Sequence, residues 1–147
     1  MSTSAEVSRE DLAGWDIVTR HIVMERDLNA FGNLFGGVML AWLDEGSALY
    51  VMDRIGYADF VTVSMDDVNF RAPARRGDAV VIYSRVAKTG KSSITLDARA
   101  VVHEPGTARR HEVINCRITF VCLRDGKPYA YFQSRPYAEW LKQRGGA

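Results

Sequence analysis

Residues that mark whole classes of protein are scarce in this chain of 147 residues. Its two cysteines, Cys116 and Cys122, lie six positions apart in a strand-like run. That separation is ~20 Å along an extended strand, which is too far for a disulfide. Its three histidines, His21, His103 and His111, share no metal-ligand spacing with each other or with the cysteines. The sequence therefore predicts reduced, half-buried thiols, no disulfide framework and no metal site.

The chain also lacks a strong net charge and a long apolar run. Its formal net charge is +1, so no basic field indicates binding to nucleic acid or to a membrane surface. The longest apolar run, VMLAWL, is far shorter than the ~20 residues that cross a bilayer. The beginning of the chain, MSTSAEVSREDLAG, is polar and has no signal-peptide core, so we expect a cytoplasmic protein.

The composition is that of an ordinary globular protein. Hydrophobic residues make up 47% of the chain and charged residues 25%. The length fits one domain and leaves little room for a second. We place this domain at residues 15–135, after a flexible N-terminal segment, 1–14, and before a short C-terminal helix or tail, 136–147.

One segment is more apolar than the rest and has the length of a helix. Residues 38–56, VMLAWLDEGSALYVMDRIG, show no strand-like alternation and end at Gly56, a typical C-terminal cap. The preceding residues, 27–37, are rich in Asn, Asp and Gly, as turns before helices are. Because this helix is apolar around most of its circumference, we expect other structure to surround it.

Strand-like segments lie on both sides of this helix in the sequence. The alternating or apolar segments that we expect to be strands are residues 15–26, 60–72, 79–88, 92–104, 111–123 and 128–133. The short link TGK and the turn RDGK, with Asp125-Gly126, indicate antiparallel hairpins. A curved antiparallel sheet wrapped around the helix would bury it, so the sequence predicts an α+β fold.

The apolar helix carries two adjacent carboxylates, Asp44 and Glu45. A buried carboxylate costs several kcal/mol unless it is paired or used. Asp44 lies seven residues after Gly37, on nearly the same helix face. Small apolar residues continue that face, so Asp44 would be partly desolvated and a better base or nucleophile. Glu45 lies on an apolar stripe as well, and Asp44 could equally be a surface residue paired with Arg54, so periodicity alone leaves the choice open.

The residues before the carboxylates suggest where a substrate carbonyl would bind. The free N–H groups at a helix N-terminus are oxyanion donors, and Gly36 and Gly37 let a ligand approach the backbone closely. Both glycines could equally relieve crowding at a tight junction. Read from the residues alone, Asn33 could make an Asx turn at the entry to the helix. The sequence has no G-x-S-x-G elbow, so a serine hydrolase is unsupported.

This combination resembles the hotdog-fold acyl-CoA thioesterases, and in particular their bacterial YciA-like branch and the cytosolic acyl-CoA hydrolases of animals. The residues that carry the resemblance are Asp27, Asn29, the pattern GN-x-FGG (Gly32, Asn33, Phe35, Gly36 and Gly37), Asp44, and the later VNF and GD. In that fold a curved sheet wraps one long central helix. Close relatives often carry asparagine where this chain has Phe31, so its loop is less polar.

The resemblance implies hydrolysis of acyl-CoA to a free carboxylic acid and coenzyme A. It favours Asp44 over Glu45 as base or nucleophile, makes the Gly37 N–H the oxyanion donor, and places Asn33 at the attacking water or the thioester. Attack by Asp44 itself and attack by water both stay open. No metal or organic cofactor is implied, because coenzyme A is part of the substrate and the product.

The resemblance also implies a set of substrate-binding residues: Asn29, Gly36, Val63, Ser64, Lys88, Lys91 and Ser92. The last three belong to KTGKSS, where cations and N–H groups suit the phosphates of coenzyme A. A second basic segment, RAPARR, supplies Arg71, Arg75 and Arg76. Each of these cations could equally be solvated surface charge. The aromatic residues that could shape the acyl tunnel are Phe31, Trp42, Tyr50 and Tyr57.

Helix geometry predicts that the protein self-associates. Gly37 and Asp44 are ~10 Å apart along a helix, whereas both must lie within roughly 3–3.5 Å of one carbonyl. An antiparallel second helix would place its Asp44 beside the first Gly37, so we expect a dimer at least, and a tetramer or hexamer as in the family. We expect no nucleic-acid or membrane partner. The runner-up function is a non-catalytic module that binds or senses acyl-CoA, which would be expected to have lost Asp44 or the glycines.

Overall fold

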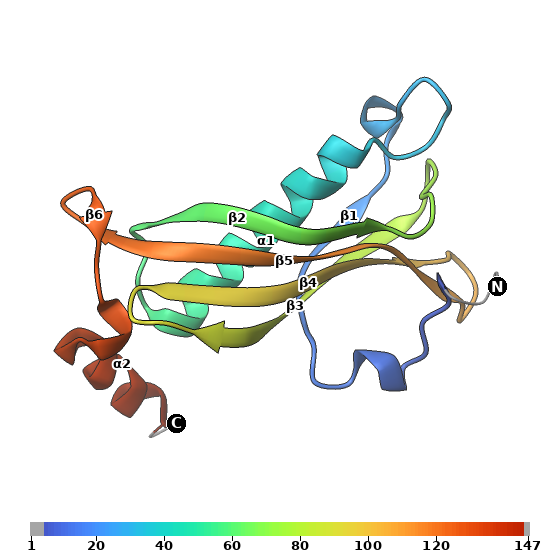
Figure 1. Cartoon of the computed structure of the whole chain (residues 1–147). Helices are drawn as coiled ribbons and strands as arrows, with labels where there is room; N and C mark the ends of the chain where they lie inside the picture. Colours follow the sequence, from blue (N-terminus) through green and yellow to red (C-terminus); the bar gives the residue numbers. More distant parts are fainter. Residues whose placement is uncertain (1–4, 146–147) are drawn as a thin grey trace.

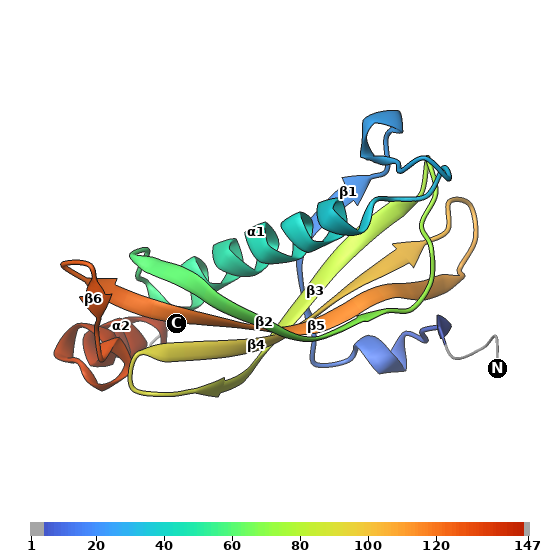
Figure 2. The same ribbon diagram turned by 45° about the horizontal axis from the view of Figure 1, so that its top comes forward.

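The apolar helix of the sequence is the axis of the fold. The structure, a computed structural model, describes residues 5–145. The long helix, α1 (Gly36–Ile55), lies in the hollow of a curled antiparallel sheet (Figures 1 and 2). The strands are β1 (Asp16–Ile22), β2 (Phe60–Phe70), β3 (Ala79–Thr89), β4 (Ser93–His103), β5 (Arg110–Arg124) and β6 (Lys127–Pro128). The remaining elements are the short 3-10 helices η2 (Glu10–Leu12), η3 (Glu25–Asp27) and η4 (Tyr131–Gln133), and the C-terminal helix α2 (Arg135–Gly145).

The sheet has the order β1-β3-β4-β5-β2, with β6 added to β5, and every pairing is antiparallel. The strands that precede and follow α1 in the sequence are β1 and β2. They therefore form the two edges of the five-stranded order β1-β3-β4-β5-β2. The helix lies along the concave face and connects these two edges in the sequence (Figure 2). The helix contacts β1, β3, β4 and β5, while its outward side stays exposed at Leu49 and Met52, and the predicted α+β fold is confirmed.

The core forms between α1 and the concave face of the sheet. The buried helix residues are Met39, Leu43, Gly46, Ser47, Val51 and Ile55. Gly46 is required where α1 crosses β1, because a methyl group there would lie 2.9 Å from Oγ1 of Thr19. The buried hydroxyl of Ser47 is 3.1 Å from that of Ser84, so each has a hydrogen-bond partner in the core.

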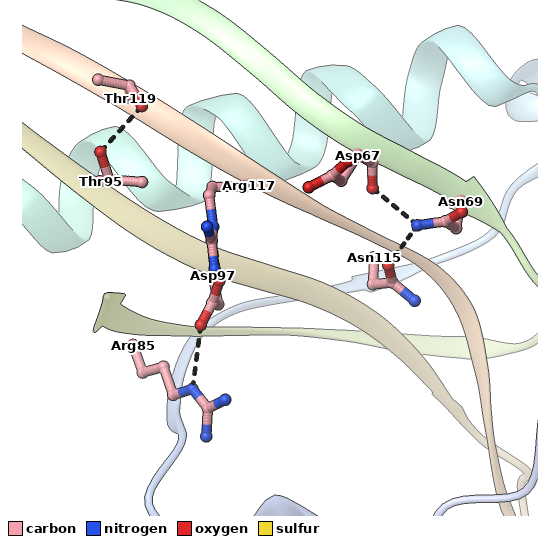
Figure 3. A network of polar contacts seen from close by, with 8 residues as sticks. All are labelled: Asp67, Asn69, Arg85, Thr95, Asp97, Asn115, Arg117 and Thr119. Carbon is pink, nitrogen blue, oxygen red and sulfur yellow. Dashed lines mark hydrogen bonds and ion pairs between the residues drawn. The ribbon is translucent and has the colours of Figure 1, made fainter. Parts of the chain in front are cut away.

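The convex face is divided between a small apolar cluster and a polar network. Val7 of the N-terminal segment is buried against Val81, Tyr83 and Val101, with Leu12 and Trp15 beside it. Farther along the same face, Asp97 accepts hydrogen bonds from Arg85 (3.4 Å) and Arg117 (3.2 Å), as Figure 3 shows. The other cross-strand polar pairs in Figure 3 are Thr95–Thr119 and Asn69–Asn115. This face is consequently held by hydrogen bonds as much as by apolar contacts.

The C-terminal end of α1 is closed by side chains from the end of the chain. Three consecutive helix carbonyls accept hydrogen bonds: that of Asp53 from Arg144 (2.6 Å), that of Arg54 from the Trp140 indole (3.2 Å) and that of Ile55 from the Tyr131 hydroxyl (2.5 Å). The last carbonyls of a helix have no partner within the helix. The C-terminal segment therefore satisfies groups that would otherwise need water.

Most predicted elements are confirmed, with shifted ends. The helix begins at Gly36, two residues before the predicted start, and Gly56 caps it with φ 67°. The predicted turn at Asp125-Gly126 is confirmed, with φ values of 54° and 75°. None of the helices within residues 5–145 is long and apolar enough to cross a membrane.

The predicted strand at 128–133 is wrong. Only Lys127–Pro128 pairs with β5, and residues 131–133 form η4. Tyr131 is 2% exposed because its ring turns under the end of α1, where its hydroxyl reaches Ile55, and a strand could not make that turn. The boundaries drawn at residues 14 and 135 remain predictions, and positions 1–4 and 146–147 of the predicted end segments lie outside the described residues.

Two glycines in the same backbone region give a matched stability test. Gly56 and Gly126 have φ values of +67° and +75°, but a methyl group at Gly56 would lie 2.5 Å from the Trp140 ring, whereas one at Gly126 meets nothing within 4 Å. Gly126→Ala should lower the free energy of unfolding by about 1–2 kcal/mol, through backbone strain alone. Gly56→Ala should lower the free energy of unfolding further, because Trp140 must also move and lose its hydrogen bond to the Arg54 carbonyl. Urea unfolding of both variants measures the difference, and equal losses would show that Trp140 contributes nothing there.

Candidate active site

The loop before α1 is held by its own backbone and by one asparagine. The Asn29 side-chain oxygen accepts hydrogen bonds from the amides of Phe31 (2.9 Å) and Asn33 (3.2 Å), and its own amide donates to the Asn33 carbonyl (2.8 Å). Gly32, at φ +80°, allows the chain to turn between them. In the described chain, Asn29 therefore shapes the loop. The half-buried Asn33 side chain makes no hydrogen bond to any residue between 5 and 145.

The loop is anchored to the segment that follows β2. The Leu34 amide donates a hydrogen bond to the Ala74 carbonyl (2.7 Å). Within the loop itself, the Phe35 amide donates a hydrogen bond to the Asp27 carbonyl (2.9 Å). Asn33 forms an isolated bridge with Arg75. The RAPARR segment is thus beside the N-terminus of α1, where its arginines can contribute positive charge.

The first two residues of α1 present the amides that the sequence suggested. The Phe35 carbonyl already accepts the amides of Val38 (3.0 Å) and Met39 (3.2 Å). No residue from 5 to 145 accepts a hydrogen bond from the amides of Gly36 and Gly37. Gly37 is exposed and Gly36 half-buried. Two unpaired N–H groups at the positive end of a helix are suited to bind a developing oxyanion.

The structure distinguishes the two adjacent carboxylates. Asp44 is half-buried and faces β2, where the Thr62 hydroxyl donates a hydrogen bond of 2.7 Å to its Oδ1. Glu45 is exposed and points away from β2, toward the side where His21 stacks on Trp42. Only Asp44 is therefore fixed by a neighbour in a partly apolar setting. Thr62 was missed by sequence reasoning, because the alternation of β2 does not reveal which residue lies opposite Asp44.

The same helix cannot bring Gly37 and Asp44 to one carbonyl. Seven residues of α1 separate them, a rise of ~10 Å. Val63 and Ser64 lie on β2 close in sequence to Thr62; Val63 is 53% exposed and Ser64 half-buried. These residues border the free edge of the sheet rather than a closed tunnel in the single chain.

The KTGKSS hairpin lies at the opposite end of the molecule from the two glycines. The Lys91 carbonyl accepts from the Phe132 amide (3.1 Å), next to Tyr131, which bonds to Ile55 at the far end of α1. Since α1 has 20 residues, that end is ~30 Å from Gly36. Lys88, Lys91 and Ser92 are therefore not brought together with Gly36 and Gly37 within one chain.

The aromatic residues proposed for an acyl tunnel occupy different places. Phe31 is 88% exposed on the loop before α1. Trp42 stacks on His21 with ring centres 4.2 Å apart. The Tyr50 hydroxyl donates to Asp16 (2.7 Å), and that of Tyr57 donates to the Leu123 carbonyl (2.5 Å). Three of the four are thus engaged away from the helix N-terminus.

Comparison with known proteins finds relatives along most of the chain. Residues 31–108 match the family model described as the Thioesterase superfamily. The acyl-CoA thioester hydrolase YciA of Escherichia coli is 30% identical over 135 residues, 88% of this chain and 97% of that protein. An acyl-CoA thioester hydrolase of Zymomonas mobilis is 34% identical over 111 residues, 74% of this chain and 72% of that protein. A hexameric thioesterase of Yersinia pestis has a TM-score of 0.73 and 33% identity, covering 78% of this chain and 94% of its own.

The two thiols provide a test of the electrostatics next to Asp44. Burial raises the pKa of Cys116 to about 12, with the Asp44 charge adding to the effect, and raises that of Cys122 to about 11. Because the thiolate is the reactive form, both should be inert to Ellman's reagent at pH 8 in the native protein and should react only after unfolding. A thiol that reacts rapidly in the native state would contradict this account and would reopen the case for a cysteine nucleophile.

Proposed function

This chain belongs to the thioesterase superfamily and is a thioester hydrolase, and from that premise we propose how its own residues hydrolyse an acyl-CoA. The observation that carries the proposal is the pairing, on one helix, of two unbonded N-terminal amides with a half-buried carboxylate, Asp44. Relatives named acyl-CoA thioester hydrolases support coenzyme A thioesters as the substrate class. No metal or organic cofactor is part of the proposal.

The glycine amides stabilise the charge that develops on the thioester oxygen. As the nucleophile adds to the carbonyl carbon, the oxygen becomes negative, and the Gly37 N–H donates to it with help from Gly36. Neither glycine has a side chain that would hold the carbonyl away. The side-chain amide of Asn33, which has no hydrogen-bond partner within residues 5–145, lies in the same loop and would hold the attacking water or the thioester.

Asp44 provides the attacking group. In one route it removes a proton from water while the water oxygen bonds to the carbonyl carbon; in the other its carboxylate attacks, and water then hydrolyses the resulting anhydride. In both routes the carbon–sulfur bond breaks, the sulfur takes up the proton, and one water is consumed. The Thr62 hydroxyl holds Oδ1 of Asp44, which leaves Oδ2 to face the substrate.

Variants of this pair should separate a catalytic role from a structural one. Asp44→Asn should lower kcat/KM for the best acyl-CoA a hundredfold or more, because the base or nucleophile is lost. Thr62→Val should lower it about tenfold, the usual effect of removing one hydrogen bond to a charged group. The matched control is Glu45→Gln on the exposed face of the same helix, which should keep near-normal activity. Equal kcat/KM values for Asp44→Asn and Glu45→Gln would show that Asp44 is not the base or nucleophile.

Each site is completed by a second copy of the chain. The ~10 Å between Gly37 and Asp44 requires it, since an antiparallel helix would bring its own Asp44 to the first Gly37. The surface beside Asp44 suits such a contact, because β2 has an unpaired edge and its Val61 and Val63 are 45% and 53% exposed. The Yersinia pestis relative is a hexamer, and we propose a hexamer built from such dimers here.

The same pairing would explain where coenzyme A binds. The thioester lies at Asp44 of one chain, and the helix end beside the KTGKSS hairpin of that chain is ~15 Å away along α1, from Asp44 to Arg54. An extended pantetheine arm spans a distance of this order, and Val63 and Ser64 lie on β2 next to Thr62, which bonds to Asp44. Lys88, Lys91 and Ser92 would then bind the phosphates, and Asn29 would keep the loop before α1 in its binding conformation.

Mixed oligomers test whether the site is shared. Asp44→Ala subunits lack the attacking group, and Gly37→Pro subunits lack the oxyanion N–H while keeping a residue that the first helical turn tolerates. Each variant alone should be inactive. After exchange of chains, hybrid dimers should regain one working site out of two. Hybrids verified by mass spectrometry that show no recovered activity would refute the shared site, and so would full activity in a wild-type monomer.

A further inference from the structure

Two exposed phenylalanine rings flank the first turn of α1. Phe35 is the residue before the helix and is 54% exposed, and Phe70 ends β2 and is 57% exposed. By contrast, Phe120 is only 1% exposed, inside the core. Large apolar side chains that gather on a surface are typical of a binding site.

Both rings lie directly beside the glycine pair. A methyl group added to Gly36 would lie 3.1 Å from Cε1 of Phe70, and one added to Gly37 would lie 2.9 Å from Cε2 of Phe35. The rings therefore approach the backbone at the places where side chains would otherwise stand. A carbonyl oxygen that accepts from the two free amides would therefore bind in the space that these rings border.

Neither ring is used elsewhere in the described chain. Trp42, Tyr50 and Tyr57 each have a ring or hydrogen-bond partner away from the glycines. Within residues 5–145, Phe35 and Phe70 stack on no other ring, and neither belongs to the apolar core. In the single chain their apolar surface is thus exposed beside the glycines to which the reacting carbonyl would bind.

Resting on the proposed function, we propose that Phe35 and Phe70 bind the first carbons of the acyl group and make the enzyme selective for neutral, apolar acyl groups of four or more carbons. An acetyl group offers one methyl, too little to contact both rings. Each further methylene buried against them should improve affinity about fourfold. An acyl group ending in a carboxylate would lose hydration there without a matching gain.

Binding of unreactive analogues tests the proposal without requiring catalysis. In S-(2-oxoalkyl)-CoA a methylene separates sulfur from the carbonyl, so the compound keeps a carbonyl but cannot be hydrolysed. Its dissociation constant is measured by calorimetry for chains from two to eight acyl-equivalent carbons, in the wild-type protein and in Phe35→Ala and Phe70→Ala. The wild type should gain about fourfold per methylene over the first carbons, and each variant less than twofold. The control is Leu141→Ala on α2, at the other end of the molecule, where Leu141 is 46% exposed.

The outcomes separate this inference from the proposed function. If the analogues bind with the expected chain-length dependence but no acyl-CoA is hydrolysed, binding of the acyl carbons by Phe35 and Phe70 is supported and the catalytic proposal fails. Equal weakening for every chain length would show a structural role and would overturn the inference. A variant that forms a smaller assembly yet keeps the chain-length dependence would place the rings in a subunit interface and would also overturn it. Wild-type turnover of succinyl-CoA at the rate of butyryl-CoA would contradict the predicted selectivity.

Discussion

The fold depends on burying the apolar side of one long helix against a curled sheet. The sheet curls over the side of α1 that carries Met39, Leu43 and Val51, whereas Leu49 and Met52 on the outward side are 50% and 38% exposed in the single chain. That requirement explains why the strands adjacent to α1 in the sequence, β1 and β2, end up at opposite edges. It also explains Gly46, the position where β1 comes too close for any side chain.

The enclosure leaves one end of the helix open and closes the other. Arg144, Trp140 and Tyr131 cover the last carbonyls, while the amides of Gly36 and Gly37 have no acceptor in residues 5–145. Helix dipoles make the open end positive. The chemistry that we propose therefore sits at the end where the fold leaves hydrogen-bonding capacity unused, and the free edge of β2 lies beside it.

The sequence predicts those helices and turns whose signals lie within a few neighbouring residues. Gly56, the Asp125-Gly126 turn and the long apolar run are local signals, and the helix and hairpins follow from them. What it could not predict depends on contacts between distant segments. The family resemblance favours Asp44 over Glu45, and the structure distinguishes the two by the hydrogen bond from Thr62 on β2, whose position opposite Asp44 neither segment reveals by itself. The helical turn at 131–133 likewise results from the fit of Tyr131 under α1, although its aromatic neighbours favour a strand.

The unequal ends of α1 also bear on how the protein opens by thermal motion. Amide exchange with solvent reports local opening, and it is slowest where hydrogen bonds and packing must break together. At the C-terminal end, any fraying has to detach α2 and η4, whereas the first turn is held by the Phe35 carbonyl and a short loop. Opening fluctuations should therefore be concentrated at Gly36 and Gly37 and decline along the helix. The part of the helix that we assign to substrate binding is also the part that can adjust its backbone with the least loss of structure elsewhere.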